Sequence, residues 1–376
     1  MLTLDKIYQA SHVLRSVIRK TDLIQAPKLC PDCNLFLKTE NLQVTGSFKV
    51  RGAYYMMSQL TEEEKARGVI ACSAGNHAQG VALAAAKNHM KALICLPDGA
   101  PISKVEATKS YGAEVCMVKG VYDDAYNKAV ELQKEHNYTF VHPFDNENVI
   151  AGQGTIGLEI LDQMADVDVV IVPIGGGGLI SGVAFAIKQL NPNIKVYGVQ
   201  ASGAPSMYES IHNDKITCLD SVSTIADGIA VKAPGDITVP LIQKYADDVV
   251  TVNDLEISEA VLLLMERCKQ IGLGVTCVCD NLESNHRDFF FGCHIAFLSH
   301  MNQWRASRPG IRAALCMSET LTFKQKRTIQ NAISGYERSI FTRERFLNHF
   351  EQYQTQRSST QTGPHLSADR VPYRPR

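Results

Sequence analysis

Residues 168–190 read DVVIVPIGGGGLISGVAFAIKQL. The apolar run at 169–174 is typical of a buried strand, and apolar residues at helical spacing follow from 179 to 190. Four consecutive glycines join the two, so bare backbone N–H groups lie beside a helix N-terminus, an arrangement that binds anions such as phosphate. A tight turn alone needs fewer glycines. The stretch therefore predicts a strand–loop–helix unit with a phosphate site.

The glycine loop matches neither of two common phosphate motifs. Counted from Gly175 or Gly176, the last position of GxGxxG falls on Ile180 or Ser181, and no Gly-Lys-Ser/Thr ending follows. The sequence thus favours a phosphate site of a kind other than a dinucleotide fold or a P-loop.

Short apolar runs alternate with helical stretches from about residue 35 to residue 270. The predicted strands are 35–40, 68–74, 91–97, 113–118, 168–174, 195–200 and 247–252. The predicted helices include 81–89, 123–136 and 178–190. This alternation predicts an α/β fold of parallel sheets flanked by helices, with ligands bound beyond the carboxyl ends of the strands.

The composition narrows the class of protein. The chain has 376 residues, 45% of them apolar, and a formal net charge of -1, which argues against nucleic acid or an anionic membrane as the main partner. No apolar run reaches the roughly 20 residues of a membrane span. Residues 1–20 form an amphipathic pattern without the features of a signal peptide. We therefore expect a cytoplasmic protein.

The eleven cysteines indicate reduced thiols rather than a disulfide framework. Cys30 and Cys33 have CxxC spacing, but no second pair lies nearby, so a loop with incidental thiols is favoured over a zinc or redox site. A second group has no regular ligand spacing: Cys277, Cys279, His286, Cys293 and His294. We predict no metal site.

One lysine stands among small and apolar neighbours in residues 46–53, GSFKVRGA. Lysine usually keeps its ammonium in water, because burial of an unpaired charge is unfavourable. Either this is a surface loop with a solvated Lys49, or Lys49 is drawn inside as a neutral imine formed with an aldehyde.

A third loop follows a predicted strand directly and opens a helix at residues 73–79, SAGNHAQ. A helix N-terminus with hydroxyl, amide and free backbone donors suits a carboxylate. Simple capping by Ser73 or Asn76 would explain one of these residues but not the whole set. A lysine, a phosphate loop and a carboxylate loop together suggest pyridoxal phosphate holding an amino acid.

Several segments resemble the threonine dehydratases, most closely the catabolic type, over residues from about 5 to 270. The matching segments are LFLKTENLQVTGSFKVRGA (35–53), ACSAGNHAQGVALAAA (71–86), AGQGTIGLEIL (151–161), VIVPIGGGGLISGVA (170–184) and TIADGIAV (224–231). The family belongs to the fold-type-II (tryptophan synthase β-like) pyridoxal-phosphate enzymes, which also include serine racemase. The resemblance implies a two-domain α/β enzyme.

The resemblance also implies roles for individual residues. Lys49 is the catalytic lysine, which carries the cofactor as a Schiff base and acts as the general base. The implied cofactor-binding residues are Phe48, Lys49, Asn76 (to the 3-hydroxyl), Gly175, Gly176, Gly177, Gly178 and Leu179. The implied substrate-binding residues are Ser73, Ala74, Gly75, Asn76 and His77.

The implied reaction is dehydration and deamination of L-threonine to 2-oxobutanoate and ammonia, with L-serine to pyruvate as a side activity. An amino-acid racemase of the same family carries a serine before the glycine of the carboxylate loop, where this chain has Ala74. A pyridoxal-phosphate binder with impaired catalysis is a further alternative. The resemblance implies a homodimer or homotetramer and allows a nucleotide effector such as AMP.

The expected domains are a large cofactor domain from residues 1–50 and 148–271, a small domain from 51–147, and an atypical, poorly ordered region at 272–376. After residue 271 the chain departs from the family, and no Ser-Gly-Gly-Asn segment follows to supply a partner for the pyridine nitrogen. Residues 301–376 hold 13 Lys and Arg against 5 Asp and Glu. A slip of reading frame near Ile271 would explain the change, and we expect a poorly stable and weakly active chain.

Overall fold

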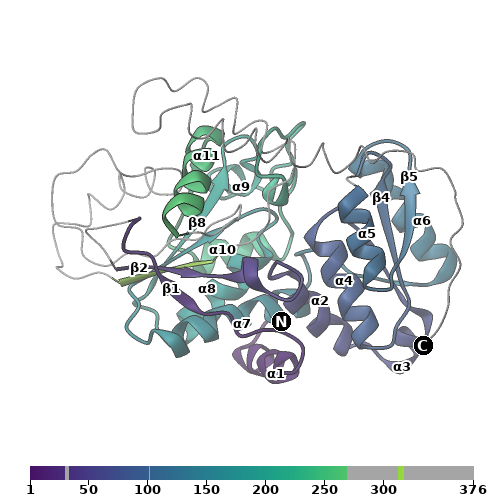
Figure 1. Ribbon diagram of the computed structural model, residues 1–376, viewed down its shortest axis with the longest axis horizontal. Helices are drawn as coiled ribbons and strands as arrows, with labels where there is room; N and C mark the ends of the chain where they lie inside the picture. Colours follow the sequence, from purple (N-terminus) through teal and green to yellow (C-terminus); the bar gives the residue numbers. More distant parts are fainter. Residues whose placement is uncertain (30–33, 101, 269–311, 317–376) are drawn as a thin grey trace, which may run out of the picture. The chain divides into compact units, whose positions relative to one another are not determined.

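The computed structural model describes residues 1–29, 34–100, 102–268 and 312–316, all within one compact unit. They form two sheets flanked by helices (Figure 1). The larger sheet has the strand order β1-β2-β10-β7-β8-β9, and only the edge pair β1–β2 is antiparallel. Its strands are β1 (Leu23–Gln25), β2 (Asn34–Lys38), β10 (Arg312–Cys316), β7 (Val169–Pro173), β8 (Lys195–Ala201) and β9 (Asp248–Val252).

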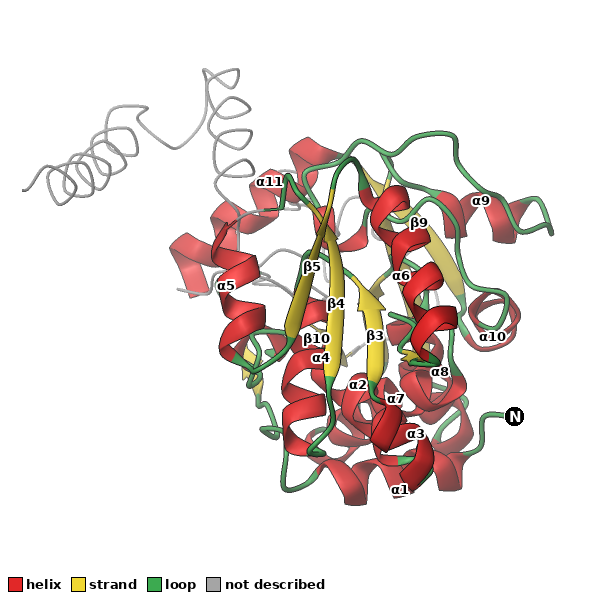
Figure 2. Ribbon diagram, turned by 90° about the vertical axis from the view of Figure 1, so that its right-hand side faces the viewer, coloured by secondary structure: helices red, strands yellow, loops and turns green. Residues whose placement is uncertain are grey.

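The smaller sheet has the order β5-β4-β3-β6 and is parallel throughout. Figure 2 shows β3, β4 and β5 side by side among their helices. The strands are β3 (Val69–Cys72), β4 (Ala92–Pro97), β5 (Glu114–Val118) and β6 (Thr139–Phe140). The predicted α/β class with parallel sheets is confirmed, and each predicted strand matches an observed one.

Several helices begin directly after a capping side chain or a glycine. Asn146, for example, caps α7 through its side-chain oxygen, which accepts from the N–H groups of Asn148 and Val149. The helices are α1 (Leu4–Leu14), α2 (Lys49–Ser58), α3 (Glu62–Arg67), α4 (Asn76–Lys87), α5 (Ile102–Ser110), α6 (Tyr122–His136), α7 (Glu147–Gln163), α8 (Gly178–Leu190), α9 (Ser206–His212), α10 (Thr238–Tyr245) and α11 (Asp254–Leu263). Single helical turns lie at η1 (Glu40–Leu42), η2 (Asp227–Ile229) and η3 (Leu264–Cys268).

Helices α2, α7 and α8 pack backbone to backbone through glycines. A Cβ built on Gly152 of α7 would lie 2.6 Å from the carbonyl oxygen of Arg51 on α2, and one on Gly182 of α8 would overlap the carbonyl oxygen of Ile150. Any larger residue would therefore push these helices apart. This close packing fixes the position of α2, whose first residue is Lys49.

The strand β10 comes from the region after residue 271. It lies parallel between β2 and β7 and pairs with both. The rest of 269–376 lies outside the described residues.

Two further predictions concern membranes and metals. No helix within the described ranges is long and apolar enough to cross a bilayer. Among the same residues, no group of three or more His, Cys, Asp or Glu side chains is arranged to hold a metal ion. The CxxC pair at Cys30 and Cys33 and the Cys/His group at 277–294 lie outside the described residues.

Candidate active site

Lys49 lies at the first position of α2, directly after the buried residue Phe48. Its backbone N–H donates to Ser47 Oγ at 3.2 Å, and its side-chain Nζ donates to the carbonyl oxygen of Pro143 at 3.0 Å. The Nζ atom also lies 5.3 Å from the centre of the Phe48 ring. Lys49 is half-buried, and its amine donates to a backbone carbonyl, so the side chain is neither fully solvated nor fully buried.

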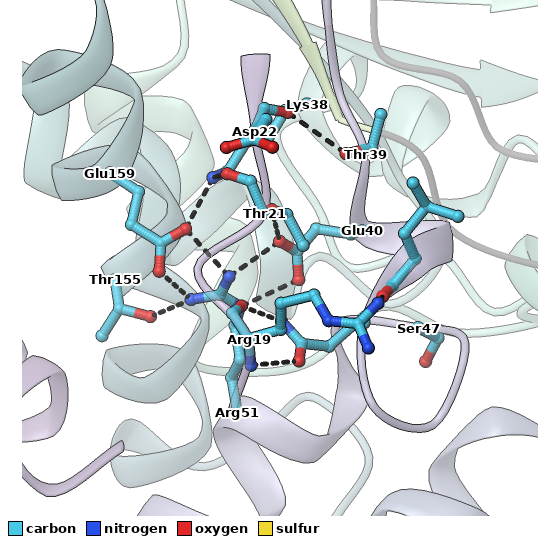
Figure 3. A network of polar contacts seen from close by, with 12 residues as sticks. Arg19, Thr21, Asp22, Lys38, Thr39, Glu40, Ser47, Arg51, Thr155 and Glu159 are labelled. Carbon is cyan, nitrogen blue, oxygen red and sulfur yellow. Dashed lines mark hydrogen bonds and ion pairs between the residues drawn. The ribbon is translucent and has the colours of Figure 1, made fainter. Parts of the chain in front are cut away.

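A buried ionic network holds the helix that carries Lys49 (Figure 3). Arg51 is fully buried and donates hydrogen bonds to both oxygens of Glu40, at 2.7 and 2.8 Å, and to both oxygens of Glu159, at 2.7 and 3.0 Å. Lys38 Nζ donates to Glu159 at 2.5 Å and to the Thr21 carbonyl at 2.5 Å. The network therefore joins β2, η1, α2 and α7 with two cations and two carboxylates.

The electrostatics of this network keep Glu40 and Arg51 charged. Burial by itself opposes the charge of Glu40, but the charge and hydrogen bonds of Arg51 outweigh it and hold the pKa of the carboxyl below its usual range. The two carboxylates in turn raise the pKa of Arg51 against the effect of its burial. Sequence reasoning missed this network, although Lys38 and Glu40 stand at the end of an apolar strand.

The predicted carboxylate loop runs from the end of β3 into α4. Helix α4 begins at Asn76, and its N-cap residue Gly75 has no side chain to occupy the first-turn N–H groups. Ser73 Oγ accepts from the N–H of Gly75 at 3.2 Å, so the hydroxyl lies at this turn. Donors are thus gathered at a helix N-terminus, as a carboxylate requires.

His77, on the first turn of α4, is buried and neutral. Its Nε2 lies 2.8 Å from the carbonyl oxygen of Val141, which makes Nε2 the donor. Burial first, and then the positive charge of Lys49, lower the pKa of His77 to about 3. The side chain therefore offers no positive charge to a substrate and instead ties α4 to residue 141.

The glycine loop is held by its carbonyl groups. Gln200 Nε2 donates to the carbonyl oxygen of Gly175 at 3.4 Å, and Thr238 Oγ donates to that of Gly176 at 2.7 Å. Gly177, the N-cap of α8, has φ of 97°, a conformation that favours glycine. With the carbonyls engaged and no capping side chain, the N–H groups of the first turn of α8 remain as anion donors.

The glycines also permit close packing that the sequence did not reveal. A Cβ on Gly176 would overlap the ring of Phe144, and one on Gly178 would lie 2.8 Å from Phe144 Cβ. On the other side, a Cβ on Gly175 would lie 3.1 Å from Ile229 Cα, in η2. Close contact with Phe144 and η2 therefore explains why residues 175, 176 and 178 are glycines, and phosphate binding by the loop stays a prediction.

Residues 141–145 connect the three predicted loops and were missed by sequence reasoning. The carbonyl of Val141 meets His77, the carbonyl of Pro143 meets Lys49, and the ring of Phe144 lies over the glycine loop. The segment joins β6 to α7, and no motif in VHPFD distinguished it from an ordinary connection. The structure thus gathers the lysine, the carboxylate loop and the glycine loop around one segment.

Comparison with known proteins agrees with this arrangement. A model of the family described as pyridoxal-phosphate dependent enzymes matches residues 14–278. The chain belongs to this family. The predicted family, fold class and cofactor of this pyridoxal-phosphate dependent enzyme are confirmed.

Three members of the family illustrate the similarity. The enzyme is 49% identical to the L-threonine ammonia-lyase of Thermotoga maritima over 280 residues, which are 74% of this chain and 70% of that protein. The structure of the processed form of threonine deaminase isoform 2 from Solanum lycopersicum is 34% identical, with a TM-score of 0.74 over 87% of this chain and 93% of that one. The structure of maize serine racemase is 36% identical, with a TM-score of 0.70 over 72% and 83%.

The residues present fit pyridoxal phosphate. The glycine loop, with its free first-turn donors and positive φ at Gly177, suits the phosphate, and the amine of Lys49 suits the aldehyde. Phe48 is adjacent to Lys49, and Asn76 is the first residue of α4. Which of these residues contacts which part of the cofactor stays a prediction.

Proposed function

We propose that this enzyme is a threonine ammonia-lyase, which converts L-threonine to 2-oxobutanoate and ammonia and L-serine to pyruvate as a side activity. The observation that carries the proposal is the gathering of Lys49, the carboxylate loop and the glycine loop around residues 141–144. The identity to a protein named L-threonine ammonia-lyase supports the choice of substrate.

The proposed roles follow from the chemistry of each group. When bound, pyridoxal phosphate withdraws electrons from the substrate Cα–H bond. Lys49 attaches the cofactor and, once free, takes the Cα proton on Nζ as the general base. Residues 73–77 orient the substrate carboxylate, and residues 175–179 hold the phosphate. Phe48 would lie beside the ring, and Asn76 would donate to its 3-hydroxyl.

The proposal is tested by removing Lys49. Lys49→Ala should lose both the visible absorbance of bound cofactor and ammonia release from L-threonine and L-serine. Lys109→Ala, an exposed lysine on α5, serves as the matched control and should keep both. Borohydride reduction followed by peptide mapping should place the label on Lys49; a label on another lysine would show that the site is wrongly assigned.

Racemisation is the alternative within the family. A racemase requires a second acid–base group on the far face of the ring, and at the position of the racemase serine this chain carries Ala74, which holds no proton. We therefore propose elimination with little racemisation. Chiral analysis of L-serine after partial turnover decides the matter, since accumulation of D-serine at a rate near that of pyruvate would overturn the proposal.

We also propose the coarser organisation implied by the family resemblance. The six-stranded sheet draws its strands from 1–50, 148–271 and β10, and the four-stranded sheet draws its strands from 51–147, which supports the predicted large and small domains. A homodimer or homotetramer, a nucleotide effector such as AMP and a cytoplasmic location remain predictions. Size-exclusion chromatography with light scattering, with and without AMP, tests the first two.

A further inference from the structure

The segment 141–145 contributes backbone carbonyl groups to two side chains of the site. Val141 accepts from His77 at 2.8 Å, and Pro143 accepts from Lys49 Nζ at 3.0 Å. The Pro143 carbonyl shares one planar peptide unit with the N–H of Phe144, so whatever binds that N–H also orients the carbonyl. The orientation of the Lys49 amine therefore depends on what holds this segment in shape.

His142 holds the segment from within. Its Nδ1 accepts from the backbone N–H of Asp145 at 2.7 Å and from that of Phe144 at 3.4 Å. An acceptor that reaches the N–H groups two and three residues later is the geometry that asparagine and aspartate adopt in turns and helix caps. Here an imidazole nitrogen takes that place.

The environment keeps this nitrogen able to accept. Burial lowers the pKa of His142 to about 4, with Asp145 acting against the shift and Lys49 adding to it. At neutral pH the ring is uncharged, Nδ1 carries the lone pair and Nε2 carries the hydrogen. The ring also packs edge-on against Phe144, with the ring centres 4.7 Å apart.

The far end of the segment is anchored independently of His142. The carboxylate of Asp145 accepts from the backbone N–H groups of Ile237 at 2.9 Å and Asp236 at 3.1 Å, just before α10. Thr238, the first residue of α10, donates to the glycine loop. The segment is thus attached at Asp145, and His142 determines how the chain turns between that anchor and Pro143.

We propose that His142 is a positioning residue for Lys49: its Nδ1 shapes the turn that presents the Pro143 carbonyl to the lysine amine. The free amine is thereby held in one orientation when it must attach the cofactor or accept a proton. This inference rests on the proposed role of Lys49. It assigns a function to a histidine that would not itself touch the reacting atoms.

Two substitutions separate the acceptor from the ring. His142→Phe keeps an aromatic ring against Phe144 but removes the acceptor, whereas His142→Asn removes the ring and restores an acceptor at the position typical of such turns. The cofactor-free proteins are mixed with pyridoxal phosphate, and the rate of attachment is followed by visible absorbance. We expect attachment to slow about tenfold in His142→Phe and to stay within about threefold of wild type in His142→Asn.

Two further readouts distinguish positioning from a general loss of structure. Hydrogen exchange at the amides of Phe144 and Asp145 should accelerate in His142→Phe only, while α2 and α7 keep their protection. The kcat for L-threonine should fall in His142→Phe with KM unchanged, and His142→Asn should restore it. Should His142→Phe fail to fold, His142→Ala, which also lacks the acceptor, replaces it in the same comparison.

The outcomes separate this inference from the proposed function. Equal attachment rates in all variants, or a loss in His142→Asn that equals the loss in His142→Phe, would overturn the role of Nδ1. Absence of ammonia release by the wild-type protein would overturn the proposed activity instead, while the attachment rates and hydrogen exchange would still test His142.

Discussion

Replacement of Glu40 by glutamine tests whether the buried network stabilises the lysine-bearing helix. The substitution keeps the size of the side chain but leaves two cations, Lys38 and Arg51, with the single carboxylate of Glu159. The amide NH2 of the new side chain would also face the donors of Arg51, which now bond to both oxygens of Glu40. The network would carry one uncompensated positive charge in a fully buried position.

The expected loss is large because the side chains of Glu40 and Arg51 are both fully buried. Removal of one partner from a buried ion pair typically destabilises a protein by about 3 to 5 kcal/mol, since the remaining charge cannot return to water. Because the pKa of Glu40 is lowered on folding, its stabilisation is present above the ordinary carboxyl range and is lost as the pH falls through the folded value. The measurement therefore belongs at pH 7.

The assay is urea unfolding of the cofactor-free protein, followed by far-UV circular dichroism. Asp162→Asn is the control, because Asp162 pairs with Lys20 on the surface, where side-chain exposures are 67% and 57% and such pairs contribute little. We expect the control to unfold with the wild-type protein and Glu40→Gln to unfold at much lower urea. A free energy of unfolding for Glu40→Gln within about 1 kcal/mol of wild type would refute the reasoning.

Three further predictions concern packing, pH and the region after residue 271. Gly182→Ala should destabilise the protein by about 1 to 3 kcal/mol in the same assay because its Cβ would overlap α7, whereas Gly99→Ala, with open space around it, should unfold like wild type. As the pH falls from 6.5 to 5, the free energy of unfolding should fall by up to about 1.4 kcal/mol per pH unit for each of His77 and His142. Folding lowers the pKa of these residues to about 3 and about 4, so the unfolded state binds protons in this range that the native state does not. His142→Asn should reduce the slope of stability against pH, and an unchanged slope would contradict the prediction. Because segment 272–376 is atypical, we expect the protein to have weak stability and low turnover. Full cofactor occupancy with ordinary lyase turnover would contradict that expectation. The coding DNA near Ile271 shows directly whether a frame slip exists.

Local sequence determined the elements and the chemical character of the loops. The strand, glycine loop and helix at 168–190 appear as predicted, with β7 at Val169–Pro173 and α8 at Gly178–Leu190. Such features depend on residues within one or two turns of each other, and a run of four glycines has few structural uses. The family and its cofactor followed from the same local motifs.

Contacts between distant residues were decided only by the tertiary structure. Lys38 and Glu159 are 121 positions apart, and Lys49 and Pro143 are 94 apart, so no local spacing brings either pair together. The strand β10 at Arg312–Cys316 pairs with β2 at Asn34–Lys38 and with β7 at Val169–Pro173, and both partners are distant from it in the sequence. The turn at His142 is local but escaped notice for a different reason: a histidine acts there as the turn acceptor, and only the positions of its Nδ1 and the two N–H groups reveal it. Local propensity determines whether each segment forms a strand, a helix or a loop. The charge-balanced network around Arg51 and the carbonyl acceptor for Lys49 form only once the helices have packed.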